Sequence, residues 1–299
     1  MQRLEEWASN YPAAFTGQDD IHKQAFKAAT WAPVCSWPGS SLEEHMPPAR
    51  YLVAFFILDD LAEDELKSFV HSIECGDPCG GAKVAAMFGL YRDILPRKDA
   101  DSVWMGHRRS FERSFLRMCK SMMGEMAVDS SVVDEQTLLT LRRDTIAVEP
   151  FLHVWLACKG FAVSLEEARA MDRLTSLRRL AVDMVILGND LVGLEHDEAG
   201  AHVDPKAADM NLILVRRRTL GGRGAAIDSV VRTYNGLVDA FEENERRVRE
   251  QGVHISATLE GYIQLLKNNV NGNIQGSVAV AEIRYPGASK YVRNVRALG

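Results

Sequence analysis

The feature that most constrains the fold is an apolar repeat of three to four residues along most of this 299-residue chain. Over residues 102–127, apolar side chains recur at the spacing that gathers them on one face of an α-helix. The same pattern runs over residues 165–194, 226–250 and 255–270. Because the alternating apolar and polar runs typical of strands are scarce, we predict an all-α protein.

Turn-forming residues interrupt this pattern and predict the loops. Prolines, glycines and serines cluster at residues 33–48, and further breaks are expected at residues 76–81, 199–205 and 221–224. The glycine-rich stretch 76–81 follows no strand and lacks a Lys-Ser/Thr pair, which argues against a phosphate-binding loop. No segment changes composition sharply and no repeat is visible. We therefore expect one catalytic domain over residues 1–299, with residues 1–15 and 287–299 peripheral.

Composition and charge argue against several classes of protein. Hydrophobic residues make up 46% of the chain and charged residues 25%, which is typical of a globular protein with a substantial core. The net charge is −6 and no long basic run is present, so we expect no nucleic-acid partner. No apolar run is long enough to cross a bilayer, and the N-terminal residues lack the apolar run of a signal peptide. We expect a cytoplasmic protein without a stable membrane anchor.

The five cysteines fit a reducing compartment. Their number is odd and most of them stand far apart, which argues against a disulfide framework. Cys75 and Cys79 are close together in the sequence. Because no second Cys/His pair completes a zinc set, we expect no metal at that point.

An acidic cluster follows an apolar run in the first third of the chain. Asp59 and Asp60 end the run, and Glu63 and Asp64 follow about one helical turn later. On a helix, Asp59 shares a face with Glu63 or Asp64, where carboxylates without a cation repel one another. Mg²⁺ binds carboxylates together with substrate phosphates and would relieve this repulsion. A solvated acidic helix end is the alternative interpretation.

A second set of oxygen donors lies on the segment predicted over residues 165–194 and just beyond it. Asn189, Gly193 and Asp197 are four residues apart and therefore line one helical face. The amide and the carboxylate are about 12 Å apart along the helix and cannot share a small ion alone. Gly193 leaves room between them for a water or a phosphate oxygen. Taken alone, the pattern fits the end of a helix equally well.

Basic side chains offer donors to an anion at two further places. Arg142 and Arg143 adjoin at the end of a predicted helix. Arg143 could pair with an acidic neighbour or hold a phosphate through its planar guanidinium group. Arg284 and Tyr285 provide donors near the C-terminus, although such a pair indicates nothing alone.

In type and order, these four groups resemble the motifs of the class I terpene synthases of bacteria and fungi. That family has an aspartate-rich motif, an arginine that senses diphosphate, an Asn-Asp-x-x-Ser-x-x-x-Glu metal motif and a C-terminal Arg-Tyr pair. Arg143 lies 46 residues before Asn189, the separation typical of the family, which favours Arg143 over Arg142 as the sensor. The segment 209–212 also looks familiar for the family, and the resemblance spans about residues 50–290.

The resemblance implies a single-domain helical bundle around an apolar active-site cavity, similar to sesquiterpene cyclases. The implied reaction is Mg²⁺-dependent ionisation of a linear prenyl diphosphate, with the C15 farnesyl diphosphate expected and C10 and C20 diphosphates as alternatives. Cyclisation of the carbocation then gives a terpene hydrocarbon or alcohol, and diphosphate is released. The resemblance implies three Mg²⁺ ions, and it leaves open whether the protein forms a homodimer.

The resemblance also assigns the site residues. The positions implied for metal binding are Asp59, Asp60, Glu63, Asp64, Asn189, Gly193 and Asp197. The substrate diphosphate would be held by Arg143, Arg284 and Tyr285, and the Ala147 carbonyl would assist ionisation. We expect Phe55, Phe56 and Trp155 to line the cavity, with an ordinary core position as the alternative for each.

Five positions depart from the family pattern. Gly193 stands in place of Ser or Thr, so a water would have to replace that ligand, and Asp197 is one methylene shorter than Glu. His196 occupies the place of a Lys, and Ala147 that of a Gly. Val278 stands where an aromatic residue often precedes the Arg-Tyr pair. These changes leave weak metal binding or an inactive member open.

Two alternatives follow from the same residues. A chain-elongating prenyl diphosphate synthase shares the helical fold, but normally carries a second aspartate-rich motif where this chain has residues 189–197. A helical binding protein of the same fold without catalysis is the other alternative.

Overall fold

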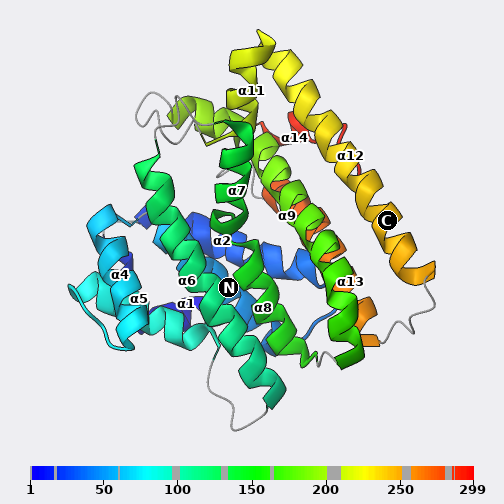
Figure 1. Ribbon diagram of the computed structural model, residues 1–299. Coiled ribbons are helices and arrows are strands. Elements are labelled where there is room, and N and C mark those ends of the chain that lie inside the picture. The colour runs from blue at the N-terminus through cyan, green and yellow to red at the C-terminus, as the bar shows by residue number, and fades with distance from the viewer. Residues whose placement is uncertain are drawn as a thin grey trace. The chain divides into compact units, whose positions relative to one another are not determined.

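The computed structural model describes residues 2–16, 19–59, 61–95, 102–128, 134–161, 165–200, 210–250, 257–279, 285 and 287–299. The elements in these residues are helices, with no strand among them, which confirms the all-α prediction (Figure 1). Within the same residues, no helix combines the length and apolarity needed to cross a membrane.

The helices follow one another along the chain. Their bounds are α1 Gln2–Ala8, the 3-10 helix η1 Pro12–Phe15, α2 Asp19–Ser36, α3 Leu42–Asp59, α4 Glu63–Cys75, α5 Ala82–Ile94, α6 Ser102–Ala127, α7 Glu135–Thr145, α8 Val148–Lys159, α9 Leu165–Gly200, α11 Leu212–Leu220, α12 Arg223–Glu250, α13 Ala257–Ala279 and α14 Ala288–Tyr291. The predicted segment 102–127 coincides with α6, and the other three predicted helices correspond to α9, α12 and α13.

The chain forms two compact units. Unit 1 comprises Met1–Val34, Pro38–Val128 and Ala147–Phe161, and unit 2 comprises Cys35–Trp37, Asp129–Ile146 and Ala162–Gly299. The single catalytic domain over residues 1–299, with peripheral ends, stays a prediction.

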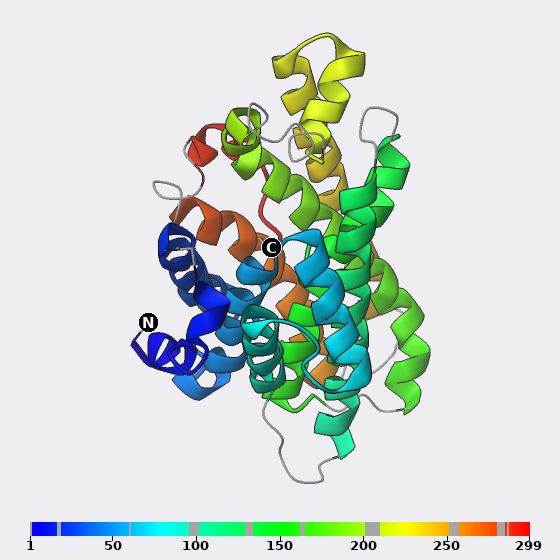
Figure 2. The same cartoon turned by 90° about the vertical axis from the view of Figure 1, so that its left-hand side faces the viewer.

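Unit 1 is built around α3, α6 and α8. Helix α3 packs against α5 and α8, and α6 packs against α4 and α8. Helices α4 and α6 lie side by side in both views (Figures 1 and 2). The core is rich in aromatic rings because α3, α5 and α6 each direct such side chains inward. Tyr51 lies 6.1 Å from Phe111 and 6.2 Å from Phe115, and Tyr91 lies 4.9 Å from Phe115, between ring centroids.

Unit 2 is organised around the long helix α9. Helices α12 and α13 pack along it, and α7, α11 and α14 also contact it (Figure 1). Most side chains between Ala181 and Leu194 are buried, as expected for a helix with neighbours on several sides. This central helix carries the predicted metal motif.

The prediction of a loop over residues 33–48 is wrong for most of that range. Helix α2 continues to Ser36 with Pro33 inside it, and α3 begins at Leu42 with Pro47 and Pro48 inside it. Ordered turn contacts explain this early start. The Ser41 hydroxyl accepts the Glu44 N–H at 3.3 Å, and the Glu44 carboxylate accepts the Ser41 N–H at 2.8 Å. This reciprocal capping box starts the helix ahead of the prolines.

The other predicted breaks are closer to the structure. The break at residues 76–81 is confirmed, because α4 ends at Cys75 and α5 begins at Ala82. The break at residues 221–224 is shorter than predicted, since α12 already begins at Arg223. Helix α9 continues to Gly200, and residues 201–205 lie outside the described residues.

Candidate active site

The acidic segment does not form one continuous helix. Helix α3 ends at Asp59 and α4 begins at Glu63, so the expectation that Asp59 shares a helical face with Glu63 or Asp64 is wrong. The chain turns because Leu61 is buried and its N–H bonds to the Leu58 carbonyl at 3.1 Å. Asp59 is therefore exposed at the end of α3, and Asp60 lies outside the described residues.

The two later carboxylates occupy the first turn of α4. Glu63 and Asp64 are exposed there, and Glu63 forms an ion pair with Lys67 at 2.7 Å. Negative charge at a helix N-terminus interacts favourably with the helix dipole. The helix dipole and the ion pair with Lys67 are therefore enough to explain why these two carboxylates lie in the first turn of α4.

The predicted cavity aromatics of α3 lie at the margin of the aromatic core. Phe55 and Phe56 are half-buried, with ring centroids 5.8 Å apart. Phe55 stacks on the fully buried Tyr51 at 6.4 Å. Partial exposure leaves both rings able to contact a bound ligand.

Trp155 occupies the interior of unit 1. Its side chain is fully buried on α8, with ring centroids 5.5 Å from His45 and 6.4 Å from Phe151. The Lys159 ammonium lies 5.9 Å from the Trp155 ring centroid. These contacts are those of a core residue.

Ala147 forms the break between α7 and α8. It has a φ of 66°, and it is the one non-glycine residue with positive φ among the residues described. Its carbonyl accepts a hydrogen bond from the buried Tyr51 hydroxyl at 2.7 Å. Ala147, whose carbonyl is expected to assist ionisation, therefore lies at a strained break between two helices. Its partner Tyr51 is not suggested by the sequence.

The two adjacent arginines have different environments. Arg142 is buried and bonds to the Asp190 carboxylate and the Met210 carbonyl. Arg143 is half-buried and makes a bidentate contact with Asp183, at 2.7 and 2.9 Å, which raises the pKa of the guanidinium. Of the two, Arg143 is the more accessible to an anion, with Asp183 as its present partner.

The motif on α9 brings a carboxylate close to the glycine. Asn189 and Asp197 are half-buried and Gly193 is buried. A Cβ atom added at Gly193 would lie 3.3 Å from the Asp197 carboxylate oxygen Oδ2. The Asp197 side chain thus folds back along the helix toward Asn189, and the missing side chain at Gly193 provides the space.

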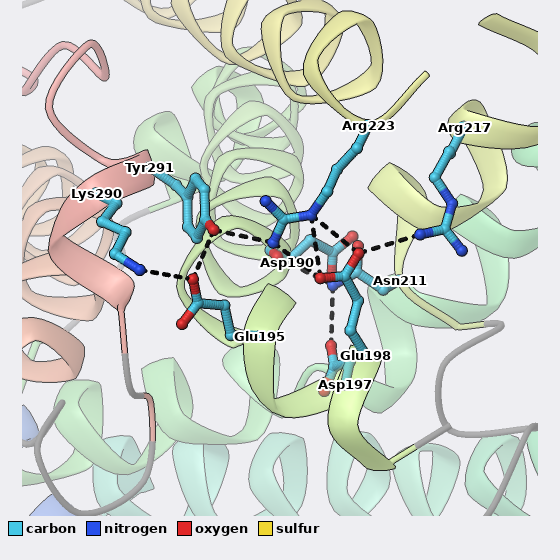
Figure 3. Close-up of polar contacts among 9 residues, drawn as sticks. All are labelled: Asp190, Glu195, Asp197, Glu198, Asn211, Arg217, Arg223, Lys290 and Tyr291. Atoms are coloured by element: carbon cyan, nitrogen blue, oxygen red, sulfur yellow. Dashed lines mark hydrogen bonds and ion pairs between the residues drawn. The ribbon is translucent and has the colours of Figure 1, made fainter. Parts of the chain in front are cut away.

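Asn211 holds this carboxylate in place (Figure 3). Its amide nitrogen donates to Asp197 Oδ2 and to the Asp190 carbonyl, both at 2.9 Å. Its amide oxygen caps α11 by accepting the Ile213 N–H at 2.9 Å. The resemblance over residues 209–212 does not predict this role, although an Asn before an apolar helix is a recognisable capping signal.

Asp190 links the same region to Arg142. Its buried carboxylate accepts hydrogen bonds from Arg142 and, at 2.9 Å, from the Leu212 N–H. Burial raises the pKa of Asp190 to about 6, while Arg142 and the Leu212 amide limit that rise. A buried charge needs such partners. Asp190 therefore fixes α7 and the start of α11 to α9.

The C-terminal segment contacts the same end of α9. The Tyr285 ring packs edge-on against His196 at 6.4 Å, and Arg284 lies outside the described residues. Tyr291 donates to Glu195 at 2.7 Å and accepts from Arg223 at 2.9 Å (Figure 3). These contacts place Tyr285 beside the motif on α9.

The donors of unit 2 suit a hard divalent cation. Asn189 and Asp197 offer an amide oxygen and a carboxylate oxygen, the ligand types that Mg²⁺ prefers. With one carboxylate in this pair, further coordination positions are open to water or to phosphate oxygens.

Comparison with known families identifies the class of protein. The family described as "Terpene synthase family 2, C-terminal metal binding" matches residues 50–240. This chain belongs to that terpene synthase family and is an enzyme of the terpene synthase class. Membership implies a prenyl diphosphate substrate and indicates the use of a divalent metal.

Individual relatives agree with this assignment. The chain is 22% identical over 289 residues to sesquiterpene synthase 6 of Postia placenta, covering 91% of this chain and 80% of the relative. The linalool/nerolidol synthase of Streptomyces clavuligerus has a similar structure, with a TM-score of 0.73, 18% identity and coverage of 92% and 94%. For germacradien-4-ol synthase of Streptomyces citricolor, the TM-score is 0.70 at 17% identity, with coverage of 93% and 94%. These structural matches support the helical fold.

Proposed function

We propose that this protein is a class I terpene cyclase that uses Mg²⁺ to ionise farnesyl diphosphate and cyclises the resulting cation. The observation that carries the proposal is the oxygen-donor face of α9, where Asn211 holds Asp197 beside Gly193. Similarity to a sesquiterpene synthase over 91% of the chain favours the C15 substrate.

Two sets of residues would hold the metal. Asp59 is the main ligand of the first set, with Asp60, Glu63 and Asp64 as further candidates. Asn189 and Asp197 form the second set, with a water in the space left by Gly193. We propose three Mg²⁺ ions, which would neutralise charge on the departing diphosphate.

The protein's own cationic groups would complete the diphosphate site. Arg143 would exchange its contact with Asp183 for phosphate oxygens, since a guanidinium binds both with the same planar geometry. Arg284 and Tyr285 would add donors from the C-terminal segment. Fixed donors aimed at developing negative charge are a large part of many catalytic effects.

The remaining groups would act on the carbocation. The Ala147 carbonyl would assist departure of the diphosphate, and its hydrogen bond to Tyr51 would hold it in position. Phe55 and Phe56 would present aromatic faces, each worth about 0.5–2 kcal/mol to a nearby cation. Trp155 would contribute only if its ring reached the cavity from the core position described above.

The test is product analysis with purified protein and Mg²⁺. Gas chromatography after incubation with C10, C15 and C20 diphosphates should show a cyclic C15 product. Asp59→Ala and Asn189→Ala should each lower turnover by at least about a hundredfold. The surface variant Asp228→Ala should behave as wild type.

Three results would contradict the proposal. Retained turnover in both site variants would refute the site, provided that circular dichroism shows all proteins folded. Consumption of isopentenyl diphosphate would indicate a chain-elongating synthase. No conversion of any of the three substrates would indicate a non-catalytic protein.

A further inference from the structure

A second cluster of metal-ligating side chains lies in unit 1, outside the proposed catalytic groups. It consists of His71 and Cys75 on α4 and Cys79 in the loop that follows. The ligand atoms of the three side chains all lie within 4.8 Å of one another. His71 and Cys75 are exposed and Cys79 is half-exposed, so an ion could reach all three from solvent.

The loop is ordered in a way that returns Cys79 to the end of α4. Gly76 ends the helix with a φ of 79°, a left-handed conformation that favours glycine, and its N–H bonds to the Ser72 carbonyl at 3.0 Å. The Cys79 N–H donates to the hydroxyl of the buried Ser72 at 2.8 Å. This bond returns the Cys79 backbone to the end of α4, and the Cys79 thiol donates to the Asp77 carbonyl at 3.4 Å.

The Cys75 sulfur and the His71 ring nitrogens are close enough to share one ion. The Cys75 sulfur lies 3.5 Å from Nε2 and 3.6 Å from Nδ1 of His71. Zinc bonds of about 2.3 Å to sulfur and about 2.1 Å to nitrogen, at tetrahedral angles, separate two such ligands by about 3.6 Å. The sulfur lies at nearly the same distance from both ring nitrogens, so it faces the ring and not the lone pair of one nitrogen. Rotation of the His71 side chain would turn one nitrogen toward an ion shared with Cys75, with little movement of the backbone.

We propose that His71, Cys75 and Cys79 form a binding site for a borderline or soft transition-metal ion, with zinc the best fit. Thiolate and imidazole donors select such ions, whereas Mg²⁺ requires oxygen ligands. Both thiols would release their protons as two metal–sulfur bonds and one metal–nitrogen bond form. A water would fill the fourth position on the exposed side.

This proposal departs from the expectation that no metal binds near Cys75 and Cys79. The missing partner is His71, which precedes Cys75 by four residues and therefore lies on the same helical face. The bound ion would fasten the end of α4 to the loop that leads to α5. It would be independent of the proposed Mg²⁺ chemistry.

The test is a zinc titration of the reduced, full-length protein in excess Mg²⁺, read with a competing chromophoric chelator. Wild type should bind one zinc per chain. His71→Ala, Cys75→Ser and Cys79→Ser should each weaken binding by about tenfold or more. Cys35→Ser removes a half-buried thiol elsewhere and should leave the affinity unchanged.

A second readout identifies the ligands directly. Zinc should protect Cys75 and Cys79 from alkylation by iodoacetamide, as read by peptide mass spectrometry, and a chelator should restore their reactivity. Cobalt should give a thiolate charge-transfer band that is lost in Cys75→Ser. Absence of zinc binding, or binding unchanged in all three variants, would overturn the proposal. Ready formation of a Cys75–Cys79 disulfide that zinc fails to prevent would also overturn it.

Discussion

At Ala147, a single methyl group opposes the backbone conformation. Its φ of 66° is left-handed, a region that costs an alanine roughly 1 kcal/mol and a glycine much less. We predict that Ala147→Gly raises the free energy of unfolding by about 1 kcal/mol, measured by urea denaturation. Ala240→Gly, in the middle of α12, is the matched control and should lower it by about the same amount. Equal losses in both variants would show that Ala147 is not strained.

At Gly193, the question is whether a missing hydroxyl limits metal binding. A serine Cβ would lie 3.3 Å from Asp197 Oδ2, so the carboxylate would have to move by a few tenths of an ångström. We predict that Gly193→Ser lowers the Mg²⁺ concentration for half-maximal turnover by about tenfold, because it adds an oxygen ligand. Gly193→Ala adds the same carbon without the hydroxyl and should give no gain. If the two variants behaved alike, the hydroxyl would not be a ligand.

At the scale of elements, the spacing of apolar residues predicts a helix well where one face of that helix is buried along its length. The bounds of α6 follow directly from its apolar face. Clustered turn-forming residues predict a loop wrongly at the start of α3, because the Ser41–Glu44 capping box outweighs the nearby prolines. The left-handed conformation of Ala147 has no signal in the sequence, since alanine is a good helix former and its partner Tyr51 is distant in the sequence.

The candidate site is likewise predictable from the sequence only in part. The spacing of Asn189, Gly193 and Asp197 correctly predicted a shared face of one helix. It did not predict that Asn211 would hold Asp197, because that contact depends on how the chain returns to α9. The spacing of Asp59 and Glu63 wrongly predicts one continuous helix, because burial of Leu61, which ends α3, has no local signature.

The capping box at α3 gives a prediction at this scale. Hydrogen bonds from Lys159 and from the Ser41 N–H lower the pKa of Glu44 from 4.5 to about 2. Because the pKa is lowered in the folded state, the stabilisation is complete above pH 4.5 and is lost as the pH falls toward 2. Glu44→Gln should therefore lower the free energy of unfolding by about 1 kcal/mol at neutral pH.

Urea denaturation between neutral pH and the acid limit of reversible folding would check this. The difference between wild type and Glu44→Gln should shrink steadily below pH 4.5. Glu43→Gln removes a more exposed carboxylate that pairs with Arg3 and should have a smaller effect at neutral pH. A difference that did not depend on pH would show that the charge of Glu44 contributes nothing.

At the scale of the whole molecule, the chain should respond to two separate classes of ligand. A ligand that binds only the folded state raises the free energy of unfolding, by about 2.7 kcal/mol at a hundred times its Kd. Mg²⁺ with diphosphate would act through the proposed oxygen ligands, those on α9 among them, and zinc through the thiol and imidazole donors at the end of α4. Different donor chemistry means that each ligand should depend on its own residues alone.

We therefore predict that the two stabilising effects can be removed independently. Mg²⁺ with diphosphate should raise the melting temperature of wild type and Cys75→Ser alike, but not that of Asn189→Ala. Zinc should raise it in wild type and Asn189→Ala, but not in Cys75→Ser, and the double variant should respond to neither. Effects at independent sites add, so the two ligands together should shift wild type by the sum of the separate shifts. Circular dichroism melting curves of the four proteins measure this, and a Cys75→Ser protein insensitive to Mg²⁺ with diphosphate would show that the sites are not independent.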